Sequence, residues 1–137
     1  MPIIVYLAGK MTGLTFEQMK GWRNKAKEKL VDNKIIVLDP TDTDLGGDPT
    51  EIEIVASNKF QINHSDLVLA ELDFNGVSLG TISEIVYSGS IGKPVISWGA
   101  NPVHESPWVA ANTICHFREL DESIDYIVTN YAIRGGM

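Results

Sequence analysis

Residues 3–9 read Ile3-Ile4-Val5-Tyr6-Leu7-Ala8-Gly9, an unbroken run of β-branched and apolar side chains that ends at a glycine. Such a run predicts a strand that is covered on both faces, as the strands of parallel sheets are. Similar runs occupy residues 35–38, 66–72 and 95–98, and residues 116–118 form a candidate for a short last strand. We therefore expect a parallel sheet of about five strands.

Helical patterns alternate with these strands. Two pairs, Thr15 with Gln18 and Thr50 with Glu53, have the spacing of a capping box, which marks the start of a helix. The expected helices cover residues 15–33, about 50–63, a stretch after residue 80, about 106–114 and a last stretch from about 121. This alternation predicts right-handed crossovers and a doubly wound, flavodoxin-like α/β fold with helices on both faces. The 137 residues fit one domain over 1–137.

Charge and composition exclude several classes of protein. The chain carries 11 Lys and Arg residues against 18 Asp and Glu residues, a net charge of −7, so it offers no basic surface to a nucleic acid polymer or an anionic membrane. Its apolar runs hold about six residues, against the ~20 that cross a bilayer. The single cysteine, Cys115, cannot form an internal disulfide, and no cationic stretch precedes the apolar start, so we expect a cytoplasmic protein.

The sequence lacks the common cofactor and metal signatures. The glycines before Lys10 and Lys93 do not have the spacing of a Walker loop, and neither a dinucleotide fingerprint nor a serine nucleophile elbow is present. The three histidines, His64, His104 and His116, lack metal-ligand spacing. We therefore expect no cofactor and no metal ion.

One polar loop has part of a calcium-binding pattern. The residues at positions one, three, six and twelve of that pattern are Asp42, Asp44, Gly47 and Glu53. Gly46 stands at position five, where an oxygen ligand belongs. A polar loop that leads into a capped helix explains the segment better.

The carboxyl ends of the strands are the expected place for a ligand, because doubly wound sheets bind there. Glu84 falls in the first turn of the helix after one of these ends, where the helix dipole favours an ionised carboxylate. An ionised carboxylate can attack the anomeric carbon of a sugar. Two plainer interpretations stay open: Thr81 and Glu84 have capping-box spacing, and Tyr6 could be a core residue.

Four segments occur in the order and spacing of a known family. They are Tyr6-Leu7-Ala8-Gly9, Asp66-Leu67-Val68-Leu69-Ala70, Ser78-Leu79-Gly80-Thr81-Ile82-Ser83-Glu84 and Gly92-Lys93-Pro94-Val95. Over about residues 3–97 the chain resembles the nucleoside 2-deoxyribosyltransferase superfamily. The resemblance implies that Glu84 attacks the anomeric carbon of a 2-deoxyribonucleoside, expels the base and forms a deoxyribosyl ester. It also implies that Tyr6 orients the Glu84 carboxylate by a hydrogen bond.

The chain departs from many members of this family at two positions. Asn58 stands where many have an aspartate proposed to handle the proton of the leaving base, and an amide cannot deliver a proton. Asp39, Asp73 or a water molecule would have to act instead. Ser78 stands where transferases acting on free nucleosides often have an aspartate. Relatives that hydrolyse deoxynucleoside 5′-monophosphates have serine there, so Ser78 favours a nucleotide, with Lys10 and Thr12 as further phosphate contacts.

The resemblance implies an enzyme that cleaves or exchanges the N-glycosidic bond of 2′-deoxynucleosides. One alternative is a hydrolase of nucleoside 5′-monophosphates, and another is a non-catalytic nucleotide-binding module of flavodoxin-like or TIR-like fold. The family's sites are usually completed by a neighbouring subunit, which implies a homodimer or larger assembly, with Ser106 and Asn112 as candidates for the contact. The residues expected to bind substrate are Gly9, Lys10, Thr12, Asp39, Asn58, Asp73, Asn75, Ser78 and Gly80.

Overall fold

The structure is a computed structural model that describes residues 2–132. Its five strands form one sheet in which every neighbouring pair is parallel. The strands are β1 (Ile4–Ala8), β2 (Ile36–Leu38), β3 (Leu67–Glu71), β4 (Val95–Trp98) and β5 (Cys115–Phe117). Their spatial order, β2-β1-β3-β4-β5, is the flavodoxin-like order. The predicted sheet is confirmed.

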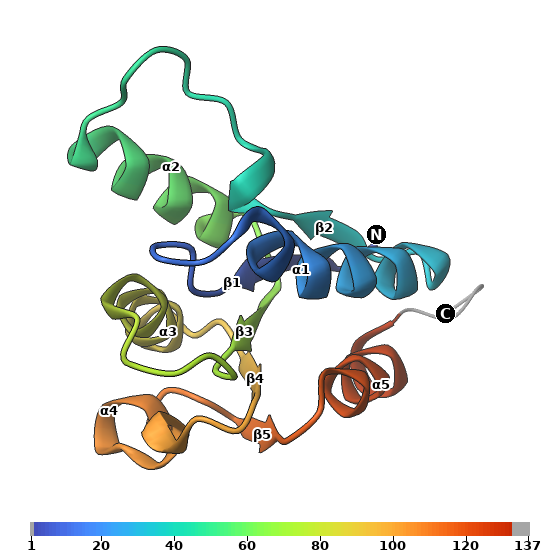
Figure 1. The fold of residues 1–137 in the computed structure, drawn as a ribbon. Coiled ribbons are helices and arrows are strands. Elements are labelled where there is room, and N and C mark those ends of the chain that lie inside the picture. Colours follow the sequence, from blue (N-terminus) through green and yellow to red (C-terminus); the bar gives the residue numbers. More distant parts are fainter. Residues whose placement is uncertain (1, 133–137) are drawn as a thin grey trace.

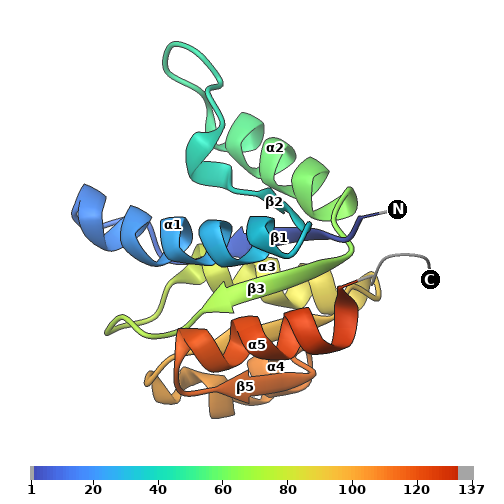
Figure 2. The same cartoon turned by 90° about the vertical axis from the view of Figure 1, so that its right-hand side faces the viewer.

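Helices cover both faces of the sheet. The helices are α1 (Phe16–Asp32), α2 (Glu51–Asn63), α3 (Leu79–Ser90), α4 (Pro107–Ala110) and α5 (Leu120–Tyr131), with short 3₁₀ turns η1 (Pro40–Asp42) and η2 (Pro102–Glu105). Figures 1 and 2 show α1 and α5 on one face and α2, α3 and α4 on the other. The two predicted capping boxes form at Thr15 and Thr50. None of the helices among residues 2–132 is long and apolar enough to span a membrane.

The core has two halves, one on each face of the sheet. Because successive side chains of a strand point to opposite faces, Val5 and Leu7 of β1 join the half that packs under α1 and α5. Tyr6 and Ala8 join the half under α2, α3 and α4. The phenol of Tyr6 is fully buried and lies on the same face as α3. The alternation of β1 thus decides which helix Tyr6 can contact.

The strand at residues 35–38 is less covered than the sequence predicted. β2 lies at the edge of the sheet, and Ile36 within it is 44% exposed, whereas the preceding Ile35 is buried. Within the described part of the chain only β1 pairs with β2, so one side of this strand has no neighbour there. An apolar run alone does not distinguish an edge strand from a central one.

The helix predicted over 106–114 is shorter in the structure, which corrects the prediction. α4 ends at Ala110, and η2 lies ahead of it. The backbone N–H of Ile114 donates to the carbonyl of Val95 at 2.9 Å, which carries the chain into β5 beside β4. Pairing with the sheet therefore ends the helix early.

The start of α3 also differs from the prediction. The helix begins at Leu79 and Ser78 is its N-cap, with the Ser78 side chain accepting from the backbone N–H of Thr81 at 3.3 Å. The capping box expected from Thr81 and Glu84 is therefore wrong. Glu84 lies in the second turn of α3, where its side chain is free for another partner.

Candidate active site

A short hydrogen bond joins the two residues on which the enzymatic interpretation depends. The hydroxyl of Tyr6 donates to Oε2 of Glu84 at 2.6 Å. Tyr6 comes from β1 and Glu84 from α3, 78 positions later in the chain. The other carboxylate oxygen, Oε1 of Glu84, accepts no hydrogen bond from Tyr6.

Glu84 lines a hollow of about 490 Å³ at the carboxyl end of β1. The wall is built by the loop after β1, by α2 and by the first turns of α3. The lining residues are Gly9, Lys10, Met11, Thr12, Asn58, Val77, Ser78, Leu79, Gly80, Thr81 and Glu84. Six of the nine predicted substrate-binding residues are among them. A hollow of this size holds a small molecule of the nucleoside class.

Burial changes the protonation of Glu84. It raises the pKa of the carboxyl to about 7, although hydrogen bonds from Tyr6 and Asn58 and the charge of Arg23 act in the opposite direction. The sequence-based expectation that the helix dipole favours ionisation is therefore wrong in direction, because Glu84 lies past the first turn and desolvation dominates. Glu84 changes charge near neutral pH, as a catalytic carboxyl often does.

Tyr6→Phe should separate positioning from packing. Without the phenol proton the pKa of Glu84 rises, so the acid limb of the kcat/KM profile should move to higher pH, and kcat should fall roughly 10- to 100-fold. The measurement is a pH–rate profile for both proteins. Tyr87→Phe is the matched control, because Tyr87 donates to Asn63 and does not line the hollow. An unchanged profile for Tyr6→Phe would show that the phenol does not orient the carboxylate.

A buried arginine supports the floor of the site. Arg23 of α1 is fully buried and donates to the carbonyls of Met19 at 3.0 Å and Gly9 at 3.1 Å. Burial lowers the pKa of Arg23, and the negative charges of Asp39 and Glu71 partly offset this. A Cβ on Gly9 would lie 2.6 Å from the Trp22 ring, so only glycine lets the loop approach α1 this closely. No sequence motif indicated that Arg23 contacts the loop after β1.

A buried carboxylate holds two loops of the site together. Glu71, at the end of β3, is 2% exposed. Its carboxylate accepts from the backbone N–H groups of Lys10 at 3.0 Å, Asp73 at 2.6 Å and Phe74 at 3.0 Å. The loops after β1 and β3 are therefore tied to one side chain. The sequence analysis did not identify Glu71, because a single polar residue in an apolar strand gives no sign of its partners.

The structure places Asp39 outside the hollow. Its carboxylate is 2.9 Å from Nζ of Lys27 and 3.4 Å from Nε of Arg23, and it caps η1 by accepting from Thr41. Burial acts to raise the pKa of Asp39, but hydrogen bonds from Thr41 and Lys27 outweigh it and hold the pKa below its ordinary value. Asp39 therefore stays ionised and has no proton to offer a leaving base.

Asp73 and Asn75 also lie outside the hollow. Asp73 accepts from the backbone N–H of Ala100 at 3.0 Å. The backbone carbonyl of Asn75 accepts from Nζ of Lys10 at 2.9 Å, so Asn75 reaches the site through Lys10. Of the two carboxylic acids suggested for the leaving base, neither lines the space next to Glu84.

A second hollow of about 270 Å³ adjoins the first. Met11 and Asn58 line both. The rest of its wall comes from the loop between η1 and α2 and from α2. These residues are Pro40, Thr43, Asp44, Leu45, Gly46, Gly47, Pro49, Ile54 and Ser57. Asn58 thus stands where the two spaces meet.

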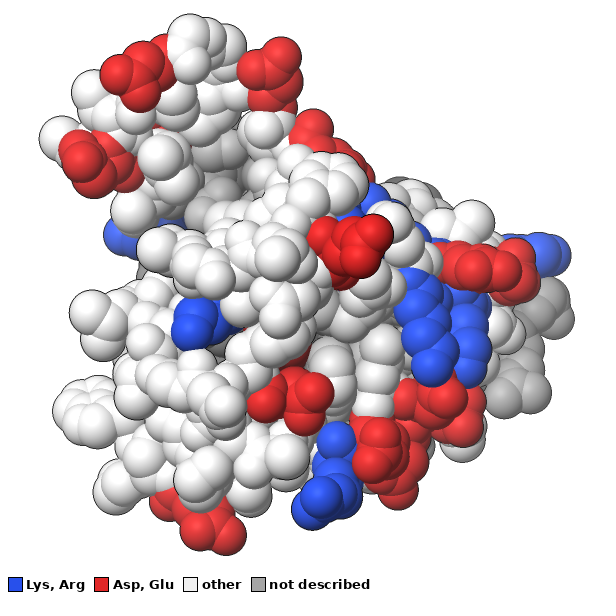
Figure 3. All heavy atoms as spheres, in the orientation of Figure 1, with Lys and Arg blue, Asp and Glu red and all other residues white. Residues whose placement is uncertain are grey.

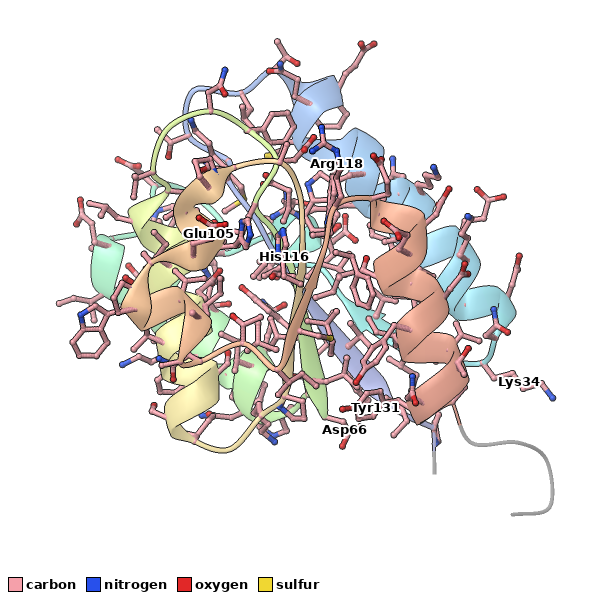
Figure 4. The ribbon with its side chains drawn as sticks, turned by 90° about the horizontal axis from the view of Figure 1, so that it is seen from below. Lys34, Asp66, Glu105, His116, Arg118 and Tyr131 are labelled. Carbon is pink, nitrogen blue, oxygen red and sulfur yellow. The ribbon has the colours of Figure 1, made fainter. Side chains whose placement is uncertain are left out.

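The histidines lie away from Glu84. The rings of His104 and His116 stack at 3.8 Å, and Nδ1 of His116 lies 2.7 Å from Oγ of Ser97. Figure 4 shows His116 on β5, and Glu105 at the end of η2. Burial lowers the pKa of His116. Within residues 2–132, no group of three or more His, Cys, Asp or Glu side chains could hold a metal ion.

A protein family and several solved structures resemble this chain. The family model of nucleoside 2-deoxyribosyltransferases matches residues 5–109. A 2-deoxyribosyltransferase from Bacillus psychrosaccharolyticus has a similar structure, with a TM-score of 0.73, 20% identity, and coverage of 90% of this chain and 91% of that one. A 2-deoxyribosyltransferase from Leishmania mexicana has a TM-score of 0.76 and 18% identity, with coverage of 95% of this chain and 99% of that one. A CMP N-glycosidase from Clostridium botulinum has a TM-score of 0.62 and 18% identity, with coverage of 90% of this chain and 97% of that one.

A search of curated proteins finds no significant sequence match. The family model nevertheless covers most of the chain, including Tyr6 and Glu84. The chain belongs to the nucleoside 2-deoxyribosyltransferase family. Membership indicates an enzyme of the transferase kind whose substrates are small molecules of the nucleoside class. The predicted resemblance is confirmed.

Proposed function

We propose that this protein breaks the N-glycosidic bond of 2′-deoxynucleosides through a covalent intermediate on Glu84. Oε1 of Glu84 bonds to C1′ while the C1′–N bond breaks and its electron pair leaves with the base. A second base or a water molecule then attacks C1′ and releases Glu84. Two displacements at C1′ retain the configuration of the sugar.

The contact between Tyr6 and Glu84 is the observation that carries this proposal. The phenol fixes one carboxylate oxygen at 2.6 Å, and the carboxylate lines a hollow of nucleoside size. A side chain that only capped α3 would need neither feature, and Ser78 already caps that helix. A fixed carboxylate meets the developing positive charge on the sugar without reorganisation.

A hydrolase of 5′-monophosphates is a second candidate, favoured by the other end of the hollow. Ser78 through Thr81 line it at the N-terminus of α3, where backbone N–H groups and the helix dipole attract anions. Lys10 lines the same space and adds a positive charge. The Ser78 hydroxyl lies 2.8 Å from Oγ1 of Thr81, so both hydroxyls face one region.

A product assay separates these candidates. Each deoxynucleoside and each deoxynucleoside 5′-monophosphate is incubated with the protein, with and without a second free base, and the products are separated by chromatography. Exchange that requires added base identifies a transferase, and free base released from monophosphates alone identifies a hydrolase. The expected excess of the favoured class is at least about tenfold in kcat/KM, as one charge-assisted contact supplies. No turnover of any substrate would favour a non-catalytic binding module.

We also propose that a second copy of the chain covers the mouth of the hollow. Val77 and Leu79 line the hollow yet are 60% and 77% exposed. Large apolar side chains exposed around a site mark an interaction surface. Asn112 is less suited to this contact than expected, because its amide donates to the Trp108 carbonyl and its side chain packs on Gly89. Ser106 is partly exposed at the start of α4.

A further inference from the structure

The space beside Glu84 lacks an obvious proton donor for a departing base. Of the residues that line the hollow, which all lie in the described part of the chain, only Glu84 and Lys10 are titratable. Glu84 is committed to C1′. Lys10 donates to the Asn75 carbonyl and lines a small space together with Ser78 and Gly76, and it does not line the second hollow.

Asn58 lies between Glu84 and the second hollow, where its amide could contact a base. It lines both hollows, and its amide acts on the Glu84 carboxylate as a hydrogen-bond donor that lowers the pKa of Glu84. A base that extends from a sugar at Glu84 past Asn58 would enter the second hollow, because Asn58 lines both spaces. An amide can donate a hydrogen bond to the base but cannot transfer a proton to it. General acid catalysis, typically worth about 10²- to 10⁴-fold, is therefore missing at this position.

The second hollow has a negative charge and no positive one. Asp44 is its only charged lining residue, and its Oδ1 is fixed by the backbone N–H of Gly46 at 2.8 Å. Figure 3 shows acidic side chains gathered over the end of the molecule that carries this loop and the start of α2. In the loop before α2, Asp48 is exposed, and so are Glu51 and Glu53 in the first turn of α2. A positively charged base is attracted by these carboxylates, whereas a neutral base is not.

From these two observations we propose that the preferred substrates are 2′-deoxynucleosides or their 5′-monophosphates whose base is already cationic, such as N7-alkylated purines. This inference rests on the proposed function. When Glu84 attacks C1′ of such a substrate, the bonding pair of the C1′–N bond neutralises the base, which leaves uncharged and needs no proton. A neutral base leaves as an anion and must take its proton from water. The site is complete for the first reaction and lacks an acid for the second.

The test compares 7-methyl-2′-deoxyguanosine with 2′-deoxyguanosine, each as nucleoside and as 5′-monophosphate. Cationic nucleosides also hydrolyse faster without enzyme, so the readout is how the kcat/KM ratio changes between variants. The wild-type ratio should exceed about 100, and Asn58→Asp should lower it at least tenfold, because the new carboxyl supplies an acid that only the neutral base needs. The loss of the Asn58 hydrogen bond to Glu84 acts on both substrates and cancels in the ratio. Circular dichroism checks that the variant is folded.

A second variant tests the charge of the base hollow. Asp44→Asn should raise KM several-fold for the cationic substrate, more than for the neutral one. Asp48→Asn is the matched control, since Asp48 belongs to the same loop but lines neither hollow. The inference is overturned if the ratio of kcat/KM values for the cationic and the neutral substrate is near one in the wild type, or if neither variant changes it. The proposed function would still stand in that case, provided that turnover depends on Glu84. Absence of turnover for every substrate overturns both.

Discussion

Glu84→Gln should reduce turnover of every substrate by at least about 10³-fold while the protein remains folded, because an amide oxygen is too weak a nucleophile to form the sugar ester. Glutamine keeps the size of the side chain and still accepts a hydrogen bond from Tyr6. The loss should therefore appear in kcat. Thermal unfolding should be unchanged or move upward, since burying the Glu84 carboxylate is unfavourable.

Two measurements make this prediction specific. Ser83→Ala is the control, because Ser83 precedes Glu84 on α3 but is exposed and does not line the hollow. Mass spectrometry of wild-type protein quenched during turnover should reveal one added deoxyribosyl group, and the Glu84→Gln protein should show none. Residual activity within tenfold of wild type in Glu84→Gln would show that another group attacks the sugar.

Glu71→Ala should be the most destabilising single change among the polar residues of the site. It leaves the backbone N–H groups of Lys10, Asp73 and Phe74 without their acceptor in partly buried positions. An unsatisfied buried donor costs about 1–3 kcal/mol, so the free energy of unfolding should fall by roughly 3 kcal/mol or more, as measured by urea denaturation. Activity should fall as well, because Lys10 lines the hollow.

Glu71→Gln is the matched comparison for this change. Its carbonyl oxygen replaces part of the acceptor capacity, so its loss of stability should be smaller than that of alanine. If Glu71→Ala changed the free energy of unfolding by less than about 1 kcal/mol, the three N–H groups would have other acceptors, and the two loops would not depend on this side chain.

The sheet and the two capped helices could be predicted because their signals are local. An apolar run such as 3–9 and a capping box such as Thr15 with Gln18 need no distant partner to be recognised. The helix over 106–114 failed for the opposite reason. Its end is decided by Ile114 pairing with Val95, a contact between distant parts of the chain. At α3, Ser78 and Thr81 are both good N-cap residues, and sequence spacing favoured the wrong one.

The candidate site was predictable only where a resemblance covered it. Glu84 and Tyr6 came from motifs, and the structure brings them together at 2.6 Å. Arg23 and Glu71 are buried charges, and the partners of each include a backbone group of a distant segment, the Gly9 carbonyl for Arg23 and the Lys10 N–H for Glu71. Charged residues are rarely buried without such partners, so sequence patterns place them on the surface by default. The raised pKa of Glu84 likewise follows from tertiary burial.

The strand order has a consequence for how this enzyme comes into being. β1 pairs with β3 as well as with β2, and α3 follows β3 in the chain. A nascent polypeptide that has left the ribosome only as far as α2 already holds Tyr6, Arg23 and Gly9, but it lacks Glu84, the nucleophile that we propose. In the proposed mechanism, turnover can begin only when β3 and α3 have emerged and docked. Under that proposal, translation that stops before α3 releases no active fragment.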